Sequence, residues 1–213
     1  RLPMTEPKWM QPSDTLVDII DEYNIDGFGK PGGTDKNTIH NYTGIYEEIL
    51  SPFVDKQGQL LEIGVQHGGS SLLWQTYLPK FSLCLVDLVD IVNPWIWQCM
   101  DQNENDYSFY EGNAYDTKFV EDLKVEWGGF DVIIDDGPHT LSSQLFTVKQ
   151  YLPLLNPGGV LAIEDIQNPD EDAKILTKAL DKEMQKNVQL YDVRTTKGRY
   201  DDFIFVVKLW SLD

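Results

Sequence analysis

The sequence predicts an open α/β fold built on a mostly parallel sheet, and three observations support this prediction. Short apolar runs typical of buried strands alternate with amphipathic helical segments from residue 58 onward. Such alternation produces right-handed β-α-β units, with helices on both faces of a parallel sheet. Only residues 196–201 separate the last two strand candidates. Because parallel neighbours need a crossover of roughly a dozen residues, at least one of these two strands is expected to run antiparallel.

The elements follow in order from the periodicity and from the residues that begin and end helices. A first helix is expected at residues 15–23, after an N-cap at Ser13 or Asp14. A second, at residues 42–50, ends near Pro52. The other helices are expected at residues 70–78, 117–124, 141–155 and 171–184, the third of them stopped by Asn-Pro-Gly-Gly. Seven strands are expected, at residues 60–65, 81–89, within 108–116, 130–136, 158–165, 188–195 and 201–210.

The length of 213 residues suits one domain with a sizeable core and an appendage. We expect residues 1–57 to form a helical and loop segment that acts as a lid, and residues 58–213 to form the main domain. Cys84 and Cys99 show neither the spacing of a zinc site nor a disulfide framework. Cys84 lies in an apolar run and is expected in the core.

The chain is strongly acidic, with 17 Lys and Arg against 35 Asp and Glu and a net charge of −18. Such a charge disfavours the phosphate backbone of nucleic acids and anionic membrane surfaces as partners. No secretory leader or membrane span is visible, so a cytoplasmic location is expected, although the chain begins at Arg1 and its true start is left open. The expected partner is a small-molecule acceptor, and a homo-oligomer is left open.

Residues 130–140, FDVIIDDGPHT, form an apolar run that ends in two acids and a histidine. The next strand candidate ends in the same way, in Glu164 and Asp165. Because neighbouring parallel strands end at one edge of the sheet, Asp135, Asp136 and these two acids are expected to converge there. Carboxylates so close together repel each other unless a cation lies among them, which favours a divalent metal site. The alternative for Asp135 is a solvated turn acid.

A glycine-rich turn, within residues 61–70, follows the first strand of the expected sheet. It matches neither G-x-G-x-x-G nor a P-loop, but its glycines would let the backbone approach a ligand closely. Asp87 ends the next strand, 23 residues past Gly64, near the spacing at which an acid binds ribose hydroxyls. Asn113 and Asp116 follow the third strand. They either accept hydrogen bonds from an exocyclic amine or serve as a turn residue and a helix N-cap.

These motifs resemble those of the class I methyltransferases. The closer resemblance is to the metal-dependent sugar O-methyltransferases of macrolide tailoring, of the macrocin and mycinamicin type, with cephalosporin-hydroxylase-like relatives. It rests on E-x-G-x-x-x-G at residues 62–68, IIDDGPH at 133–139, and the NPGG and IED sequences. Residues 33–50 also resemble an N-terminal motif of these proteins, whereas Pro138 stands where the family usually has Ser. The resemblance implies a Rossmann-like class I methyltransferase fold.

The resemblance also implies a role for each acid at the sheet edge. It makes Asp136, Glu164 and Asp165 the ligands of Mg²⁺, with Asp136 also catalytic, and His139 the general base. Hard oxygen ligands suit this cation. The competing interpretation of His139 is structural, as a helix cap or a carboxylate partner. The residues expected to contact S-adenosylmethionine are Glu62, Gly64, Gly68, Ser70, Asp87, Asn113, Ala114, Asp135, Thr34, Lys36 and Tyr42.

Some expected contacts have a structural alternative of equal weight. Residues 33–36 serve equally well as a capped loop, and His67 equally well as a surface residue. His40 lies in the N-terminal motif, which in relatives covers the cofactor.

We therefore expect an S-adenosylmethionine- and Mg²⁺-dependent O-methyltransferase that acts on a hydroxyl of a sugar or glycosylated small molecule. One alternative is a metal-dependent methyltransferase of catechols or other phenols, and another is a cofactor-binding module without methyl transfer. The acceptor, its reacting hydroxyl and the choice between Mg²⁺ and Mn²⁺ are left open. Acceptor specificity is expected to lie in residues 1–50, 95–105 and 167–172.

Overall fold

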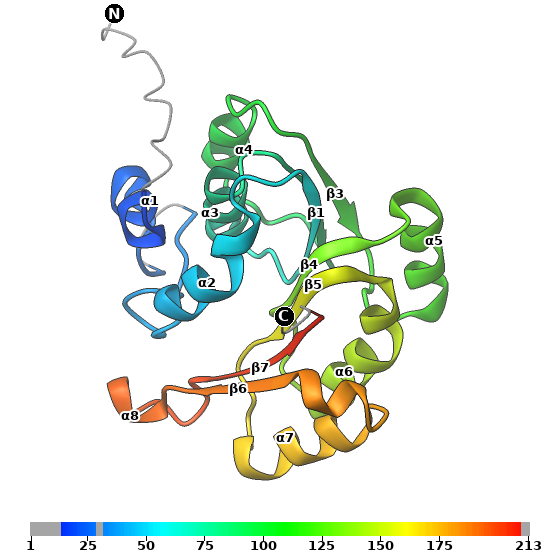
Figure 1. Cartoon of the computed structure of the whole chain (residues 1–213). Helices are drawn as coiled ribbons and strands as arrows, with labels where there is room; N and C mark the ends of the chain where they lie inside the picture. Colours follow the sequence, from blue (N-terminus) through cyan, green and yellow to red (C-terminus); the bar gives the residue numbers. More distant parts are fainter. Residues whose placement is uncertain (1–13, 29–31, 210–213) are drawn as a thin grey trace, which may run out of the picture.

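The central element of the fold is a seven-stranded sheet with helices on both faces (Figure 1). The structure is a computed structural model that describes residues 14–28 and 32–209. The strand order is β3-β2-β1-β4-β5-β7-β6. The strands are β1 (Gly58–Ile63), β2 (Phe81–Asp87), β3 (Tyr107–Glu111), β4 (Phe130–Asp135), β5 (Leu155–Ile163), β6 (Val188–Asp192) and β7 (Phe203–Lys208).

The direction of the strands confirms the predicted fold class. Strands β1 to β5 pair in parallel, whereas β7 is antiparallel to both β5 and β6. The strand order reverses at β1, with β2 and β3 on one side and β4 and β5 on the other. Such a reversal opens a crevice at the carboxyl ends of the adjoining strands, where ligands bind in open α/β sheets. The topology therefore places a candidate site at the ends of β1 and β4.

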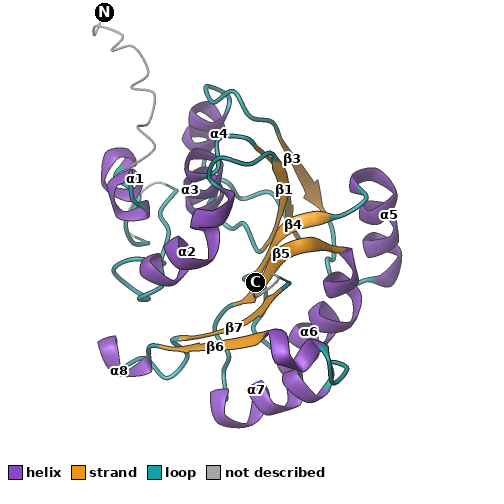
Figure 2. Cartoon of the chain, in the orientation of Figure 1, coloured by secondary structure: helices purple, strands orange, loops and turns teal. Residues whose placement is uncertain are grey.

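Successive residues of the strands face opposite sides of the sheet and build two separate hydrophobic clusters. Leu60 and Leu83 belong to the cluster beneath α1 to α4, whereas Leu61 and Cys84 belong to the cluster beneath α5 to α7. The two helical layers are distinct in Figure 2. The helices are α1 (Leu16–Tyr23), α2 (Thr43–Leu50), α3 (Gly69–Tyr77), α4 (Pro94–Met100), α5 (Thr117–Trp127), α6 (Leu141–Phe146), α7 (Pro169–Lys178) and α8 (Arg194–Lys197).

The helix predicted at residues 141–155 is interrupted in the structure. Helix α6 ends at Phe146 and continues as a π-helical turn, Thr147–Tyr151, and a 3-10 turn, Leu152–Leu154. Strand β5 then begins at Leu155, where it pairs with Phe130, so the Asn-Pro-Gly-Gly sequence lies within the strand and not before it. Sheet pairing with β4 therefore overrides the helical periodicity of this segment.

Two helix starts also differ from the predictions. The N-cap of α1 is Thr15, which forms a capping box with Asp18, and not Ser13, which lies outside the described residues, or Asp14. Helix α4, which was not predicted, begins with Pro94 after Asn93, whose side chain accepts from the Trp95 backbone N–H. A proline at the first helical position after an Asn cap is a standard start.

The N-terminal segment is integral to the core on one face of the sheet. Leu16, Ile19 and Tyr46 are fully buried in the same cluster as Leu73 of α3. The loop between α1 and α2 thereby lies against the carboxyl edge of the sheet, since it supplies a contact to Asp136. The predicted boundary at residue 57 stays a prediction. Within the described ranges, no helix combines the length and apolar character that crossing a membrane requires.

Candidate active site at the carboxyl edge of the sheet

The turns after β1, β4 and β5 meet at one point. Ile63 pairs with Asp135, and Asp135 pairs with Ile163. Asp136 is the first residue after β4 and Glu164 is the first residue after the adjacent strand β5. The Asp136 backbone N–H donates to Ile63 O at 2.8 Å. Gly64 has φ +89°, and a Cβ on it would lie 2.0 Å from the Asp136 carbonyl oxygen. Only glycine allows this close approach, which brings the glycine-rich turn against the acids.

A buried lysine from the N-terminal loop lies among these acids. Lys36 Nζ donates to Asp136 Oδ2 and to Glu164 Oε2, both at 2.8 Å, and its side chain is 1 % exposed. Burial by itself lowers the pKa of Lys36, but the carboxylates of Asp136, Glu164 and Asp35 outweigh it and raise the pKa well above its usual value. The side chain is therefore an ammonium ion, and it neutralises part of the acidic cluster.

Two tyrosines from the same N-terminal segment hold the acids that follow β5. Tyr46 OH donates to Glu164 Oε1, and Tyr42 OH donates to Asp165 Oδ1 at 2.5 Å. Burial raises the pKa of Glu164, and it raises the pKa of both tyrosines, so the hydroxyls remain donors. Both Glu164 oxygens are thus engaged, one by Lys36 and one by Tyr46.

His139 faces the acids from the turn after β4. Its Nε2 lies 3.5 Å from Asp165 Oδ2 and 3.7 Å from Asp136 Oδ1, and its side chain is 29 % exposed. His139 and Asp165 both have positive φ, 58° and 54°. Such conformations are uncommon for residues other than glycine and cluster at functional sites. The cap of the following helix is Thr140, so His139 does not have that role.

The side chains that could hold a metal ion in this arrangement are Asp136, His139 and Asp165. One ligand atom from each lies within 4.8 Å of the others. The ligand set predicted from the sequence, Asp136, Glu164 and Asp165, stays a prediction; here Glu164 faces Lys36 and Tyr46. A second group of this kind consists of His40, Asp201 and Asp202.

The second group extends the acidic network, and no sequence motif predicts it. His40 Nδ1 lies 2.5 Å from Asp202 Oδ1, and its ring stacks on that of Tyr42 with the centroids 4.9 Å apart. Arg199 lies 3.5 Å from Asp202 Oδ1. No pattern around residues 199–202 points to a site, because two acids before a strand are common on any surface.

A cavity of about 420 Å³ lies beside the acids, between the turns after β1, β2, β3 and β4. Asp87 lines it, and its Oδ2 accepts from the backbone N–H groups of Val65 and Gln66, which fixes the glycine-rich turn. Asn113 also lines it, with Oδ1 accepting from the Tyr115 N–H as in a turn, whereas Asp116 is the N-cap of α5. The residues predicted to bind cofactor that line this cavity are Gly64, Asp87, Asn113 and Ala114.

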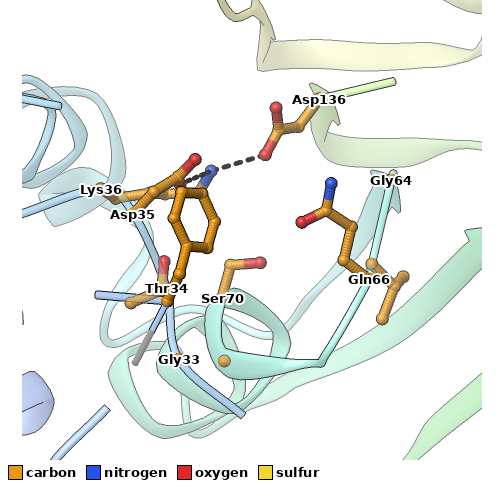
Figure 3. A pocket seen from close by; sticks show the side chains of 11 residues that line it. Gly33, Thr34, Asp35, Lys36, Gly64, Gln66, Ser70 and Asp136 are labelled. Carbon is orange, nitrogen blue, oxygen red and sulfur yellow. Dashed lines mark hydrogen bonds and ion pairs between the residues drawn. The ribbon is translucent and has the colours of Figure 1, made fainter. Parts of the chain in front are cut away.

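A narrow pocket of about 20 Å³ adjoins the acids on the other side of Gly64 (Figure 3). In Figure 3, Thr34, Asp35 and Lys36 face Gln66 and Ser70 across it, and a dashed line joins Lys36 to Asp136. Thr34 is 4 % exposed, yet its Oγ1 has no hydrogen-bond partner among the described residues. A buried hydroxyl without a partner is costly, which points to a polar ligand in this pocket.

Four residues predicted to bind cofactor line neither cavity. Glu62 is fully buried and accepts hydrogen bonds from Ser70, Ser71 and Trp74 of α3. Gly68 faces the Val92 and Ile96 side chains. Tyr42 holds Asp165, and Asp135 accepts from Tyr115 OH, Thr147 OH and the Gly137 N–H. These residues support the lining of the site, and their contact with a cofactor stays a prediction. Gln66, which the sequence prediction omitted, lines both cavities.

Comparison with known proteins places the chain in a family. Residues 61–166 match the model of a methyltransferase domain. The 8-demethyl-8-α-L-rhamnosyl tetracenomycin-C 2′-O-methyltransferase of Streptomyces olivaceus is 30% identical over 158 residues, 71% of this chain and 40% of the relative. The mycinamicin VI 2″-O-methyltransferase of Micromonospora griseorubida is 27% identical over 60% of this chain and 32% of its own length. The chain thus spans less than half the length of these curated relatives.

Solved structures share the fold. The MycE methyltransferase of mycinamycin biosynthesis, in complex with Mg, SAH and mycinamycin VI, superposes with a TM-score of 0.68 at 20% identity, covering 92% of this chain and 53% of that one. Apo CalS11, a TDP-rhamnose 3′-O-methyltransferase, gives a TM-score of 0.55 at 16% identity over 78% of both chains. The chain therefore contains a methyltransferase domain at residues 61–166.

Proposed function

We propose that the chain forms the catalytic part of an S-adenosylmethionine- and Mg²⁺-dependent O-methyltransferase that acts on a hydroxyl of a sugar or glycosylated small molecule. The observation that carries the proposal is the position of Asp136. It lines the large cavity and the narrow pocket, and its carboxylate also belongs to the cluster with Asp165 and His139. One residue thereby joins a nucleoside-sized cavity to a group of metal-ligating side chains.

The large cavity fits the nucleoside half of S-adenosylmethionine, and the narrow pocket adjoins it at Gly64 and Asp136, on the side proposed for the amino-acid half. The large cavity has the volume for a nucleoside, with Asp87 at one end to accept from ribose hydroxyls and Ala114 at the other to contact a base. The narrow pocket has room for little more than one water molecule, so it would widen on taking up the amino-acid end, whose carboxylate would lie beside the Lys36 ammonium. Gly64 lines both cavities, and its lack of a side chain lets the turn after β1 pack against the Asp136 backbone between them.

The acidic cluster fits a divalent ion. Asp136 Oδ1 and Asp165 Oδ2 are hard oxygen donors, and Mg²⁺ is usually bound by one or two carboxylates while the remaining positions stay with water or substrate. His139 is the third member of the group, but imidazole is a poor match for Mg²⁺, so we give it another role. When bound, the ion supplies positive charge that lowers the pKa of an acceptor hydroxyl.

His139 is the proposed general base. Its Nε2 faces Asp136 and Asp165, which would stabilise the imidazolium formed after proton transfer. The side chain is partly exposed, so an acceptor hydroxyl can reach Nε2 from solvent. An imidazole has a suitable pKa for taking a proton near neutral pH. S-adenosylmethionine, when bound, would supply the methyl group to the deprotonated oxygen, with S-adenosylhomocysteine as the leaving group.

The relatives suggest the acceptor class for the test. Those that match act on rhamnosyl and other sugar hydroxyls, according to their names. We therefore expect transfer of a labelled methyl group from S-adenosylmethionine to a rhamnoside, with activity lost in excess EDTA and restored by Mg²⁺ or Mn²⁺. A catechol offered in parallel tests the alternative acceptor. Transfer that persists in EDTA would exclude metal dependence, and transfer to the catechol alone would exclude a sugar acceptor.

A further inference from the structure

Lys36 touches both halves of the proposed site. Its ammonium donates to Asp136 and Glu164, and its side chain also lines the narrow pocket beside Thr34. We propose that Lys36 couples the two binding events: a carboxylate ligand in the narrow pocket attracts the ammonium and so releases the acids to a divalent ion. This inference rests on the proposed function, because it concerns the same cofactor and metal.

The first step is that the Lys36 charge opposes a metal ion at the same carboxyl group, because Lys36 binds Asp136 Oδ2 while Asp136 Oδ1 belongs to the proposed metal site. Asp136 Oδ2 and Glu164 Oε2 each lie 2.8 Å from Nζ, and the ammonium is enclosed by protein. A divalent ion drawn to these carboxylates meets a fixed positive charge, and like charges in a buried site repel strongly. Without a ligand in the pocket, the structure therefore holds its own counter-ion at the acids.

The second step is that the narrow pocket gives the ammonium another partner. Thr34 lines that pocket, and its buried Oγ1 has no hydrogen-bond partner among the described residues. A carboxylate accepts from both a hydroxyl and an ammonium. Because Lys36 and Asp136 line the pocket together, a carboxylate there would compete with Asp136 for the ammonium. Asp136 and Glu164 then each lose a positive neighbour.

Thermodynamic linkage makes the consequence measurable. If a carboxylate ligand tightens metal binding, the metal must tighten binding of that ligand by the same factor. Coupling between sites is commonly about 5- to 150-fold in affinity. A nucleoside that lacks the carboxylate fills only the large cavity and leaves Lys36 at the acids, so it should produce no coupling.

The test is calorimetric titration of Mg²⁺ into the full chain, alone, with saturating S-adenosylhomocysteine, and with saturating 5′-methylthioadenosine, which lacks the amino-acid group. We expect S-adenosylhomocysteine to tighten Mg²⁺ binding about tenfold or more and 5′-methylthioadenosine to leave it unchanged. Equal Mg²⁺ affinity in all three titrations would overturn the coupling and leave the proposed function standing. Equal tightening by both nucleosides would place the coupling elsewhere. Failure of the chain to bind either Mg²⁺ or S-adenosylhomocysteine would overturn both.

A variant and a matched control test whether the coupling depends on the Lys36 side chain. Lys36→Met keeps the length and removes the charge, so Mg²⁺ should bind more tightly without cofactor, and S-adenosylhomocysteine should no longer change its affinity. Lys197→Met is the control: Lys197 Nζ donates to Thr38 O and His40 O, so it anchors the same loop without touching the acids. It should retain the wild-type coupling. Circular dichroism checks that both variants fold, and coupling that survives in folded Lys36→Met would contradict the proposal.

Discussion

His139 is the proposed base, and kinetics can distinguish this role from that of a metal ligand. Its Nε2 lies within 3.7 Å of two acids that belong to the metal-ligating group. We expect His139→Ala to lower kcat by roughly 10²- to 10⁴-fold, the usual contribution of a positioned base, with unchanged affinity for Mg²⁺ and S-adenosylhomocysteine. Calorimetry together with steady-state kinetics measures both. A variant whose Mg²⁺ affinity falls in parallel with kcat would show that His139 is a ligand.

Glu62 illustrates how a buried acid makes stability depend on pH. Burial raises the pKa of Glu62 above its usual 4.5, and the hydrogen bonds from Ser70, Ser71 and Trp74 and the charge of Lys36 only partly oppose the shift. Above pH 4.5 the folded protein therefore holds this proton more tightly than the unfolded chain does. Protonated Glu62 therefore stabilises the folded state at low pH, and this stabilisation is lost as the pH rises through the raised pKa.

The substitution Glu62→Gln isolates this effect, because an amide cannot ionise and can still meet the serine and tryptophan donors. The unfolding free energy of the wild type minus that of the variant should fall as the pH rises above 4.5, by up to about 1.4 kcal/mol per pH unit. Urea unfolding at several pH values between 4 and 8 measures it. Glu104→Gln, at an exposed position, is the control for losing one charge. A difference that stays constant or rises with pH would contradict a raised pKa.

At the scale of elements, the turn after β1 depends on one glycine. Gly64 and Gly158 have similar positive φ, +89° and +81°, but a Cβ on Gly64 would meet the Asp136 backbone, whereas nothing lies within 4 Å of one on Gly158. Gly158→Ala should therefore cost only the backbone strain, about 1–2 kcal/mol. Gly64→Ala should cost at least about 2 kcal/mol more, since the clash separates β1 from the turn after β4. Chemical denaturation of both variants checks this, and equal losses would show that the close approach is unimportant.

The sequence predicted those elements whose cause is local. The apolar runs at β1, β2, β4 and β5 and the periodicity of α3 and α5 lie within single segments, so their type follows from the pattern. The early start of β5 depends on pairing with β4, which no local pattern contains, and the π-helical turn after α6 has no marker in the sequence. Helix α4 is short and begins with proline, so it carries too little periodicity to be recognised.

In the candidate site, too, the residues at strand ends were predictable from the sequence, whereas the contacts between distant segments were not. Asp136, Glu164 and Asp165 follow strand ends, and their convergence follows from the topology of parallel sheets. The contact of Lys36 with these acids spans 100 and 128 residues of sequence and arises from tertiary packing of the N-terminal loop. The pairing of Tyr42 and Tyr46 with the acids after β5 has the same origin. A single sequence contains no measure of such distant contacts.

At the scale of the whole molecule, the net charge is −18, and the acids that the proposed function uses lie at one edge of the sheet. Acids from the turns after β4 and β5 and from the start of β7 meet there, and the N-terminal segment contributes Lys36, Tyr42 and Tyr46 as donors. This segment also supplies part of the core beneath α3, and its residues Thr34, Asp35 and Lys36 line the narrow pocket. The site is therefore a property of the complete fold, and not of residues 61–166 alone.

The central claim is that a methyl-donor cofactor and a divalent ion meet at Asp136. A crystal of the full chain soaked with S-adenosylhomocysteine and Mn²⁺ tests it most directly, because Mn²⁺ is located by its anomalous scattering. We predict the nucleoside between Asp87 and Ala114, its carboxylate beside Thr34, and one Mn²⁺ in contact with Asp136 and Asp165. Mn²⁺ bound only by His40, Asp201 and Asp202, or cofactor outside the cavity lined by Asp87, would contradict this account.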